Sequence, residues 1–294
     1  QTKLIHSASE DLEVFSHWLG VLPAPLFDTQ RAAALVGLGA GQSYRALVAH
    51  FFDIELPKDE TQSDWLQRPL TDAQAHYAAQ DVTYLHPMGV QLQNQAMERN
   101  RLDWVLEEGA SLRPGGKPPI AKFKTAYRLP AEQQRVLAEV VEWRESEARY
   151  RDRPRSWILN DKIVMGVARA VPRSVRELAA VEDMPQGLVR RAGDELVARI
   201  VGAVETDTDQ PPAVILKPLA TEQRRSVSML SESLKEIAES TDIPAEVLMP
   251  KADLEHLVRE QMNPSLTAPE NWSGWRAEIV VAPLRQRLKE TAAS

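Results

Sequence analysis

The chain has 294 residues, of which 43% are hydrophobic and 26% charged, with a net charge of −7 and no cysteine. This length predicts two or three domains that each bury a core, and the composition is typical of a globular protein. The composition excludes disulfides and thiolate metal sites, and with no secretory signal or long apolar run we expect a cytoplasmic protein without membrane contact.

The first predicted elements are two short strands around a helix. Apolar runs at 4–6 and 26–27, bounded by turn residues, predict buried strands. Residues 10–19 predict a helix that is opened by a serine cap and packs on the face that contains Leu12. Asp11 lies beside this face, so we expect its carboxylate along the packed side, where a charge needs a cation nearby.

A second helix begins at Thr71, which forms with Gln74 a capping box in which each side chain binds a free amide of the other residue. Apolar positions that include Val82 mark the face that we expect to be buried. Tyr77 and Asp81 are four residues apart, so phenol and carboxylate share one face of the helix. A proton-handling group beside an acid is what metal-assisted hydrolysis requires.

Asp11, Tyr77 and Asp81 lie within two longer strings, HSASEDLEVF and SDWLQRPLTDAQAHYAAQDV. Both strings resemble the DEDD superfamily of 3′–5′ exonucleases, in the subclass that carries a tyrosine, and most closely the ribonuclease D family. The resemblance implies that Asp11 and Asp81 are catalytic metal ligands from the second and third motifs. It also implies that Tyr77 is catalytic and positions or deprotonates the attacking water.

The metal site that this resemblance implies needs more than two carboxylates. It holds two Mg²⁺ or Mn²⁺ ions, which are hard cations that prefer oxygen ligands. The family's first motif, Asp-x-Glu on an early strand, has no counterpart here. We therefore expect the chain to lack two of the four ligands and to be inactive as it stands. Asp28 ends a strand before a helix and is interpreted as a helix cap, so it is left out of the site.

Two segments predict the domain boundaries. GASLRPGGKPP at 109–119 is rich in Gly and Pro, and ETDTDQPP at 205–212 is acidic and ends in two prolines. The predicted parts are a partial exonuclease domain at 1–108, a linker at 109–128, a helical domain at 129–204, a linker at 205–217 and a helical domain at 218–294.

The middle of the chain is basic, with 18 Lys and Arg against 12 Asp and Glu in residues 111–204. The flanks are acidic, with 7 against 15 in residues 1–110 and 10 against 15 in residues 205–294. Arginines that neutralise phosphates, interleaved with aromatic rings that stack on bases, predict nucleic-acid binding. Trp157 precedes two apolar residues and is expected in the core. The candidate nucleic-acid-binding residues are Arg144, Arg149, Arg151 and Arg153.

Both helical domains resemble HRDC modules, the first through WRESEARYRDRPRSWILND and the second through AEVLMPKADLEHLV. The implied fold class is mainly α with an α/β part: a truncated ribonuclease H-like exonuclease domain followed by two all-α HRDC domains. The implied function is a 3′–5′ exoribonuclease that trims structured RNA such as tRNA precursors by two-metal hydrolysis, with no obligate protein partner. The alternative is a non-catalytic nucleic-acid-binding protein that uses its HRDC modules.

Overall fold

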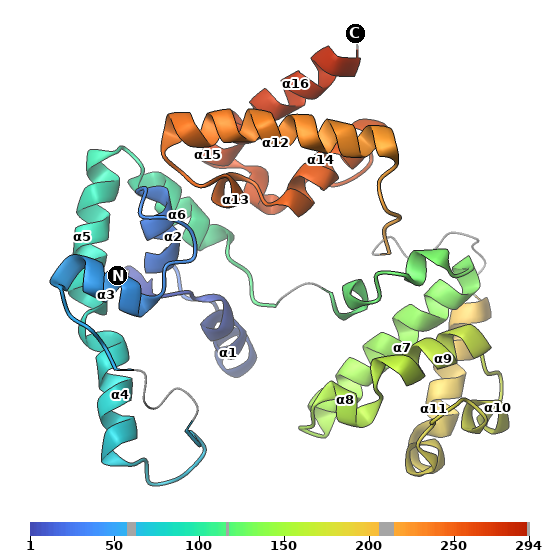
Figure 1. Cartoon of the computed structure of the whole chain (residues 1–294). Helices are drawn as coiled ribbons and strands as arrows, with labels where there is room; N and C mark the ends of the chain where they lie inside the picture. Colours follow the sequence, from blue (N-terminus) through green and yellow to red (C-terminus); the bar gives the residue numbers. More distant parts are fainter. Residues whose placement is uncertain (58–62, 116–117, 206–214, 293–294) are drawn as a thin grey trace. The chain divides into compact units, whose positions relative to one another are not determined.

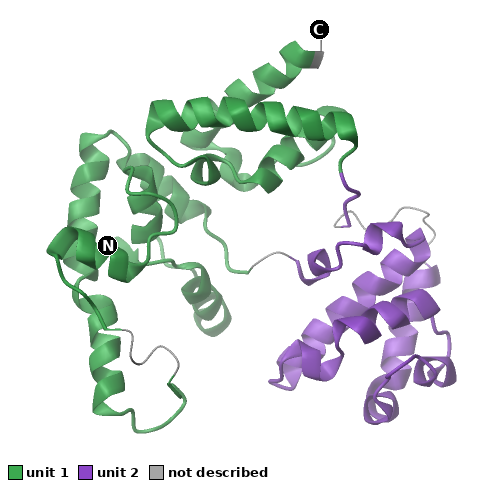
Figure 2. Ribbon diagram, in the orientation of Figure 1, with its two compact units in different colours: residues 1–115, 219–294 green, residues 116–218 purple. Residues whose placement is uncertain are grey.

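The computed structural model describes residues 1–57, 63–115, 118–205 and 215–292. The chain forms two compact units: unit 1 combines residues 1–115 with 219–294, and unit 2 contains residues 116–218 (Figure 2). Each unit has a hydrophobic core of its own. Parts of both predicted linkers lie outside the described residues, and the domain boundaries drawn from them stay a prediction.

The first part of unit 1 combines a two-stranded sheet with the helices labelled α1 to α6 in Figure 1. Its elements are β1 (Lys3–Ile5), α1 (Ser9–Leu19), β2 (Leu26–Asp28), α2 (Thr29–Leu35), α3 (Tyr44–Phe52), α4 (Asp72–Thr83), α5 (Leu85–Glu98) and α6 (Leu102–Ser111). The two strands pair in parallel, with Lys3 opposite Leu26 and Ile5 opposite Asp28. A parallel pair needs a crossover connection, which α1 provides.

Helix α6 approaches the sheet closely at one glycine. A Cβ atom on Gly109 would lie 2.0 Å from the carbonyl oxygen of Leu26 in β2. Only a residue without a side chain lets the helix come this near to the strand. Helix α2 packs against α5 and α6, and Phe27 and Leu35 are almost completely buried in this part of the core.

One buried carboxylate caps α2 and also binds the segment directly before α1. Asp28, 2% exposed, accepts the backbone N–H groups of Gln30 (2.8 Å) and Arg31 (3.2 Å) at the start of α2. It also accepts those of Ser7 (3.2 Å) and Ala8 (2.9 Å), directly before α1. The prediction that Asp28 is a helix cap is confirmed. The predicted serine cap of α1 is wrong, because the N-cap residue is Ala8 and no side chain caps this helix.

Helix α4 begins as predicted but is more exposed than predicted. Thr71 and Gln74 make both hydrogen bonds of the capping box, at 3.1 and 2.9 Å. Val82, which was expected on the buried face, is 62% exposed. Burial of the apolar stripe resumes only in α5, where Leu92 is completely covered. Among the described elements, α4 packs mainly on α5, so nothing covers the side that carries Val82.

The last part of unit 1 is helical and joins the first part in a single core. Trp275 stacks on Trp104 of α6, with 4.8 Å between ring centroids. The adjacent Arg276, 2% exposed, donates to Glu108 of α6 at 2.5 Å. The elements of this part are α12 (Thr221–Thr241), α13 (Ala245–Leu248), α14 (Lys251–Met262), η3 (Glu270–Trp272), α15 (Gly274–Arg276), η4 (Ala277–Val281) and α16 (Ala282–Ala292).

Unit 2 is helical throughout its described residues. Its elements are η1 (Pro119–Lys122), η2 (Ala126–Arg128), α7 (Ala131–Tyr150), α8 (Arg155–Ile158), α9 (Asp161–Ala170), α10 (Val175–Ala179) and α11 (Gln186–Glu205). The long helix α7 packs against α9 and α11, and buried side chains such as Val140, Val164 and Leu196 fill the space between them.

The predicted fold class, mainly α with a small α/β part, is confirmed. Within the described ranges, no helix combines the length and the apolar character that crossing a membrane requires.

Candidate active site

The three residues predicted to be catalytic come from two helices of unit 1. Asp11 lies in the first turn of α1, and Tyr77 and Asp81 lie on α4, one helical turn apart. Asp11 is exposed, and its neighbour Leu12 takes the buried position at 1% exposure. The prediction that Asp11 points along the packed side is therefore wrong, because α1 packs through the next residue.

Asp11 and Asp81 are both exposed residues, but the surroundings of each carboxylate raise its pKa. Burial raises the pKa of Asp81. Burial also raises the pKa of Asp11, and the negative charges of Glu10 and Asp28 add to the effect. Neither carboxylate has an ion-pair partner among the described residues. A bound cation would remove this electrostatic cost, so both side chains are suited to bind one.

Helix α4 is held in place by a residue that no sequence pattern singled out. Tyr44, the first residue of α3, donates its hydroxyl to the carbonyl of Gln80 (3.0 Å) and accepts the N–H of Tyr84 (3.0 Å). Burial raises the pKa of Tyr44, and the negative charge of Asp81 raises it further. His6, between β1 and α1, packs edge-on against the Tyr44 ring, with 5.7 Å between centroids. Through these two rings, the segment before α1 contacts α3, which is hydrogen-bonded to α4.

The Tyr77 side chain is half-buried, and its ring centroid lies 5.8 Å from that of Trp65. Its four-residue spacing from Asp81 places both on the same side of α4. The Tyr77 hydroxyl has no hydrogen-bond partner among the described residues, so it is available to water or substrate.

Asp11 and Asp81 offer the type of ligand that a divalent cation needs, because carboxylate oxygens are the ligands that Mg²⁺ and Mn²⁺ prefer. However, the described part of the chain contains no group of three or more His, Asp or Glu side chains that could hold a metal. Nor does a hydrogen bond or ion pair within that part join Asp11 to Tyr77 or Asp81. The two-ion site and the expected lack of a first motif both stay predictions.

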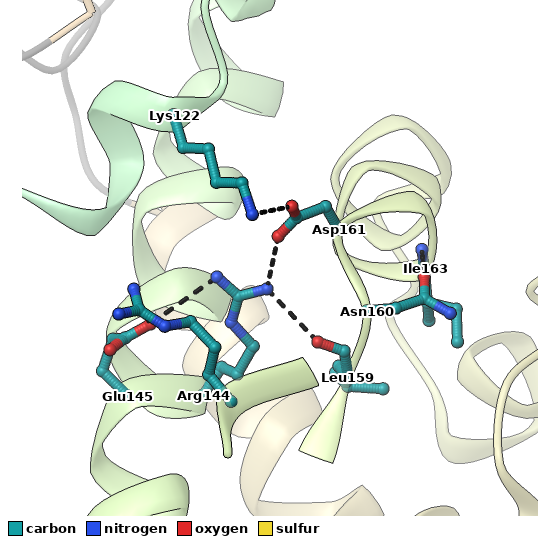
Figure 3. A network of polar contacts seen from close by, with 8 residues as sticks. Lys122, Arg144, Glu145, Leu159, Asn160, Asp161 and Ile163 are labelled. Carbon is teal, nitrogen blue, oxygen red and sulfur yellow. Dashed lines mark hydrogen bonds and ion pairs between the residues drawn. The ribbon is translucent and has the colours of Figure 1, made fainter. Parts of the chain in front are cut away.

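One of the four arginines predicted to bind nucleic acid is a structural residue. The Arg144 side chain is completely buried, and its Nη1 donates to Asp161 (2.8 Å) and to the carbonyl of Leu159 (3.2 Å), as Figure 3 shows. Lys122 binds the other oxygen of Asp161 at 2.6 Å. The assignment of Arg144 as a phosphate ligand is therefore wrong, because a guanidinium without exposed surface cannot reach an RNA backbone.

The other three arginines lie where α7 ends. Arg149 and Arg153 are exposed, and neither has a carboxylate partner among the described residues. Arg151 is half-buried and forms an ion pair with Glu147, one turn earlier on α7. Of the four arginines that the sequence predicted to bind nucleic acid, Arg149 and Arg153 are therefore the two that remain accessible to a phosphate.

Comparison with known families agrees with this geometry. A family model for a 3′–5′ exonuclease matches residues 1–96, which include Asp11, Tyr77 and Asp81. A family model for the HRDC domain matches residues 133–200, which form most of unit 2. The two acid-bearing helices and the small parallel sheet thus belong to a 3′–5′ exonuclease, a class of hydrolase that depends on divalent metal ions. That residues 218–294 form a second HRDC module stays a prediction.

Similar proteins narrow the class to one family. Ribonuclease D of Pseudomonas paraeruginosa is 39% identical over 298 residues, which cover 98% of this chain and 78% of that protein. Ribonuclease D of Escherichia coli is 30% identical, with coverage of 98% and 79%. The crystal structure of E. coli RNase D, described as an exoribonuclease involved in structured RNA processing, superposes with a TM-score of 0.83 and the same coverage. The chain belongs to the ribonuclease D family, and its function is that of a 3′–5′ exoribonuclease. The non-catalytic alternative is not favoured.

Proposed function

We propose that the protein removes nucleotides one at a time from the 3′ ends of structured RNA, such as tRNA precursors in the cytoplasm, at a site that contains Asp11, Tyr77 and Asp81. The observation that carries the proposal is the pair on α4. Tyr77 and Asp81 share one face of that helix, and neither side chain has a hydrogen-bond or ion-pair partner among the described residues. The pKa of Asp81 is raised by burial.

Each residue has a distinct role in this proposal. Asp11 and Asp81 hold Mg²⁺ or Mn²⁺ through their carboxylate oxygens. A divalent cation at this position supplies electrostatic stabilisation of the attacking and leaving oxygens during displacement at phosphorus. The Tyr77 hydroxyl orients the attacking water or accepts its proton. Tyr44 acts through the backbone, because its two hydrogen bonds hold the turn of α4 that carries Asp81.

Because the chain as it stands is expected to be inactive, the test uses the chain extended by a segment that carries the family's first motif. It measures single-turnover release of 3′ nucleotides, with the protein in excess over a labelled RNA that has a 3′ tail. Asp81→Asn should lower the metal-dependent rate by roughly 100-fold or more, since a metal ion contributes several kcal/mol to the transition state. Tyr77→Phe should lower it less, by roughly 10- to 100-fold, because the carboxylates remain.

Asp72→Asn is the matched control, because Asp72 is an exposed acid in the first turn of the same helix. It should leave the rate within about twofold of that of the parent protein, because no metal-ligand role is assigned to it. Metal-dependent release that survives both Asp11→Ala and Asp81→Asn would contradict the assignment of the site.

A further inference from the structure

Among the described residues of α4, the one buried side chain is polar. Gln74 is 2% exposed, whereas the other residues of this helix are exposed or half-buried. Burying an amide costs free energy unless its oxygen and its nitrogen both find partners. The oxygen Oε1 accepts the N–H of Thr71 (2.9 Å) in the capping box. A glutamate would complete that box equally well, so the box alone does not account for the amide nitrogen of Gln74.

The amide nitrogen of Gln74 holds the segment of residues 63–68, which we call the Trp65 loop. It donates to the carbonyl of Asp64 at 3.0 Å. A hydrogen bond from Arg68 Nη1 to the carbonyl of Trp65 (2.9 Å) orders the loop further. The loop is therefore attached to the first turn of α4 through a single buried side chain.

The Trp65 loop carries a ring that packs on Tyr77. Both rings are half-buried, and their centroids lie 5.8 Å apart with 51° between the ring planes, which is within the range of attractive aromatic pairs. Gln74 and Tyr77 are three residues apart, so they share one face of α4. Gln74 thus holds the loop on the face from which Tyr77 extends. Without the Trp65 ring, a half-exposed tyrosine would sample several staggered positions.

We propose that Trp65 and Gln74 are positioning residues for Tyr77: Gln74 fixes the Trp65 loop, and the Trp65 ring holds the phenol in one orientation before the substrate binds. The proposal rests on the proposed function, in which the Tyr77 hydroxyl orients the attacking water or accepts its proton. That role requires the hydroxyl at one place relative to Asp81. A small displacement of a positioned group lowers the rate strongly, and packing that locks the side chain prevents such a displacement.

The first measurement follows the Tyr77 ring in the chain as it stands. The five tyrosines are labelled with fluorotyrosine, and the fluorine NMR signal of Tyr77 is identified by its loss in Tyr77→Phe. Trp65→Leu should shift and sharpen this signal, because the neighbouring ring and its restraint are both removed. Gln74→Glu keeps the capping box and Gln74→Leu adds no charge, yet both should change the signal, because each removes the amide donor that holds the loop.

Thr71→Val is the matched control. It removes the hydroxyl that accepts the N–H of Gln74 (3.1 Å) and so weakens the cap of α4. The amide donor of Gln74 and the Trp65 loop remain, so the Tyr77 signal should stay in place. Circular dichroism confirms that each variant is folded.

The second measurement is a double-mutant cycle on the single-turnover rate of the chain extended by the first motif. Trp65→Leu and Gln74→Glu should each lower the rate by roughly threefold to tenfold, and by no more than Tyr77→Phe does, since they act only through its hydroxyl. In the Tyr77→Phe background, the same two changes should alter the rate by less than about twofold. Trp65→Phe should keep most of the rate, because an aromatic ring still packs on Tyr77.

An unchanged Tyr77 signal in Trp65→Leu, or in both Gln74 variants, would overturn the proposal. An equal loss of rate with and without the Tyr77 hydroxyl would overturn it as well, because a merely structural role gives that result. The same holds if Thr71→Val changes the signal as Gln74→Glu does, since helix capping would then be the cause. A failure of the proposed function is distinguishable, because Tyr77→Phe would then leave the rate of the extended chain unchanged while the NMR signals still report the contact.

Discussion

At the scale of single residues, Asp11 and Asp81 should make the protein less stable until a cation binds. Their pKa values are raised in the folded state, so the stability that they contribute is complete below pH 3.8, the ordinary value, and is lost as the pH rises through the folded value. At pH 7 without metal, Asp81→Asn should leave the melting temperature equal or higher.

Added Mg²⁺ or Mn²⁺ should give the parent protein a higher melting temperature than Asp81→Asn. At a metal concentration of ten times Kd, the parent protein should gain about 1.4 kcal/mol, and Asp81→Asn should gain much less. Thermal melts with and without metal check this at pH 7. Equal metal-induced shifts in both proteins would show that Asp81 is not a ligand.

The buried Arg144 should control the stability of unit 2. Burial alone would raise the pKa of Asp161, but hydrogen bonds from Lys122 and Arg144 outweigh it and lower that pKa. Arg144→Met should therefore cost about 1.5–3 kcal/mol at pH 7, which is typical of a hydrogen bond to a charged group. The stability from a lowered pKa is present above pH 3.8 and lost as the pH falls through the folded value, so the difference should shrink below pH 3.8. Urea unfolding at pH 7 and pH 3 measures the loss of stability that Arg144→Met causes. An equal loss at both pH values would contradict the ion pair.

At the scale of elements, Asp28 should contribute more to stability than an ordinary helix cap. Asp28→Ala leaves four backbone N–H groups without their acceptor, two in the first turn of α2 and two in the segment directly before α1, at a cost of about 3 kcal/mol. Ser43→Ala is the matched control, because Ser43 caps α3 alone through one N–H and should cost only about 1 kcal/mol. Urea unfolding of both variants measures the two costs. Similar costs would show that Asp28 supports α2 alone and not the segment before α1.

The same elements show what the sequence could predict. The capping box of Thr71 and Gln74 was predictable, because both partners lie within four residues and their chemistry is local. The hydrogen bonds of the segment before α1 were not, because their acceptor Asp28 comes some 20 residues later and reaches this segment only through strand pairing. Trp157 was expected in the core but is 71% exposed, for a related reason: apolar character predicts burial, but the rotation of the short helix α8 decides which neighbour is buried.

Local sequence patterns also predicted only part of the candidate active site. Asp11, Tyr77 and Asp81 were found because they lie in recognisable strings, whereas Tyr44 lies in none and acts through backbone groups of Gln80 and Tyr84. Local patterns therefore indicate the chemistry of this chain, and tertiary contacts determine which side chains position it.

At the scale of the whole molecule, two separate cores predict two unfolding transitions. Arg276 donates to Glu108 and to the carbonyls of Leu248 (3.0 Å) and Val247 (2.9 Å) in unit 1. Arg276→Met should lower the free energy of unfolding of unit 1 by about 3–5 kcal/mol, because it leaves a buried carboxylate unpaired. The free energy of unfolding of unit 2 should not change. Calorimetry resolves the two; a common shift of both transitions would contradict independent cores.

Unit 1 is assembled from the two ends of the chain, with the whole of unit 2 between them in sequence. A protease that cleaves one peptide bond between residues 205 and 219 would therefore produce two polypeptides and yet release neither. The ring stack of Trp104 on Trp275 and the contact of Arg276 with Glu108 would still hold them together. Such a nicked protein would show two bands in a denaturing gel and one peak in gel filtration. Cleavage of the chain at this position therefore does not by itself separate the two parts of unit 1.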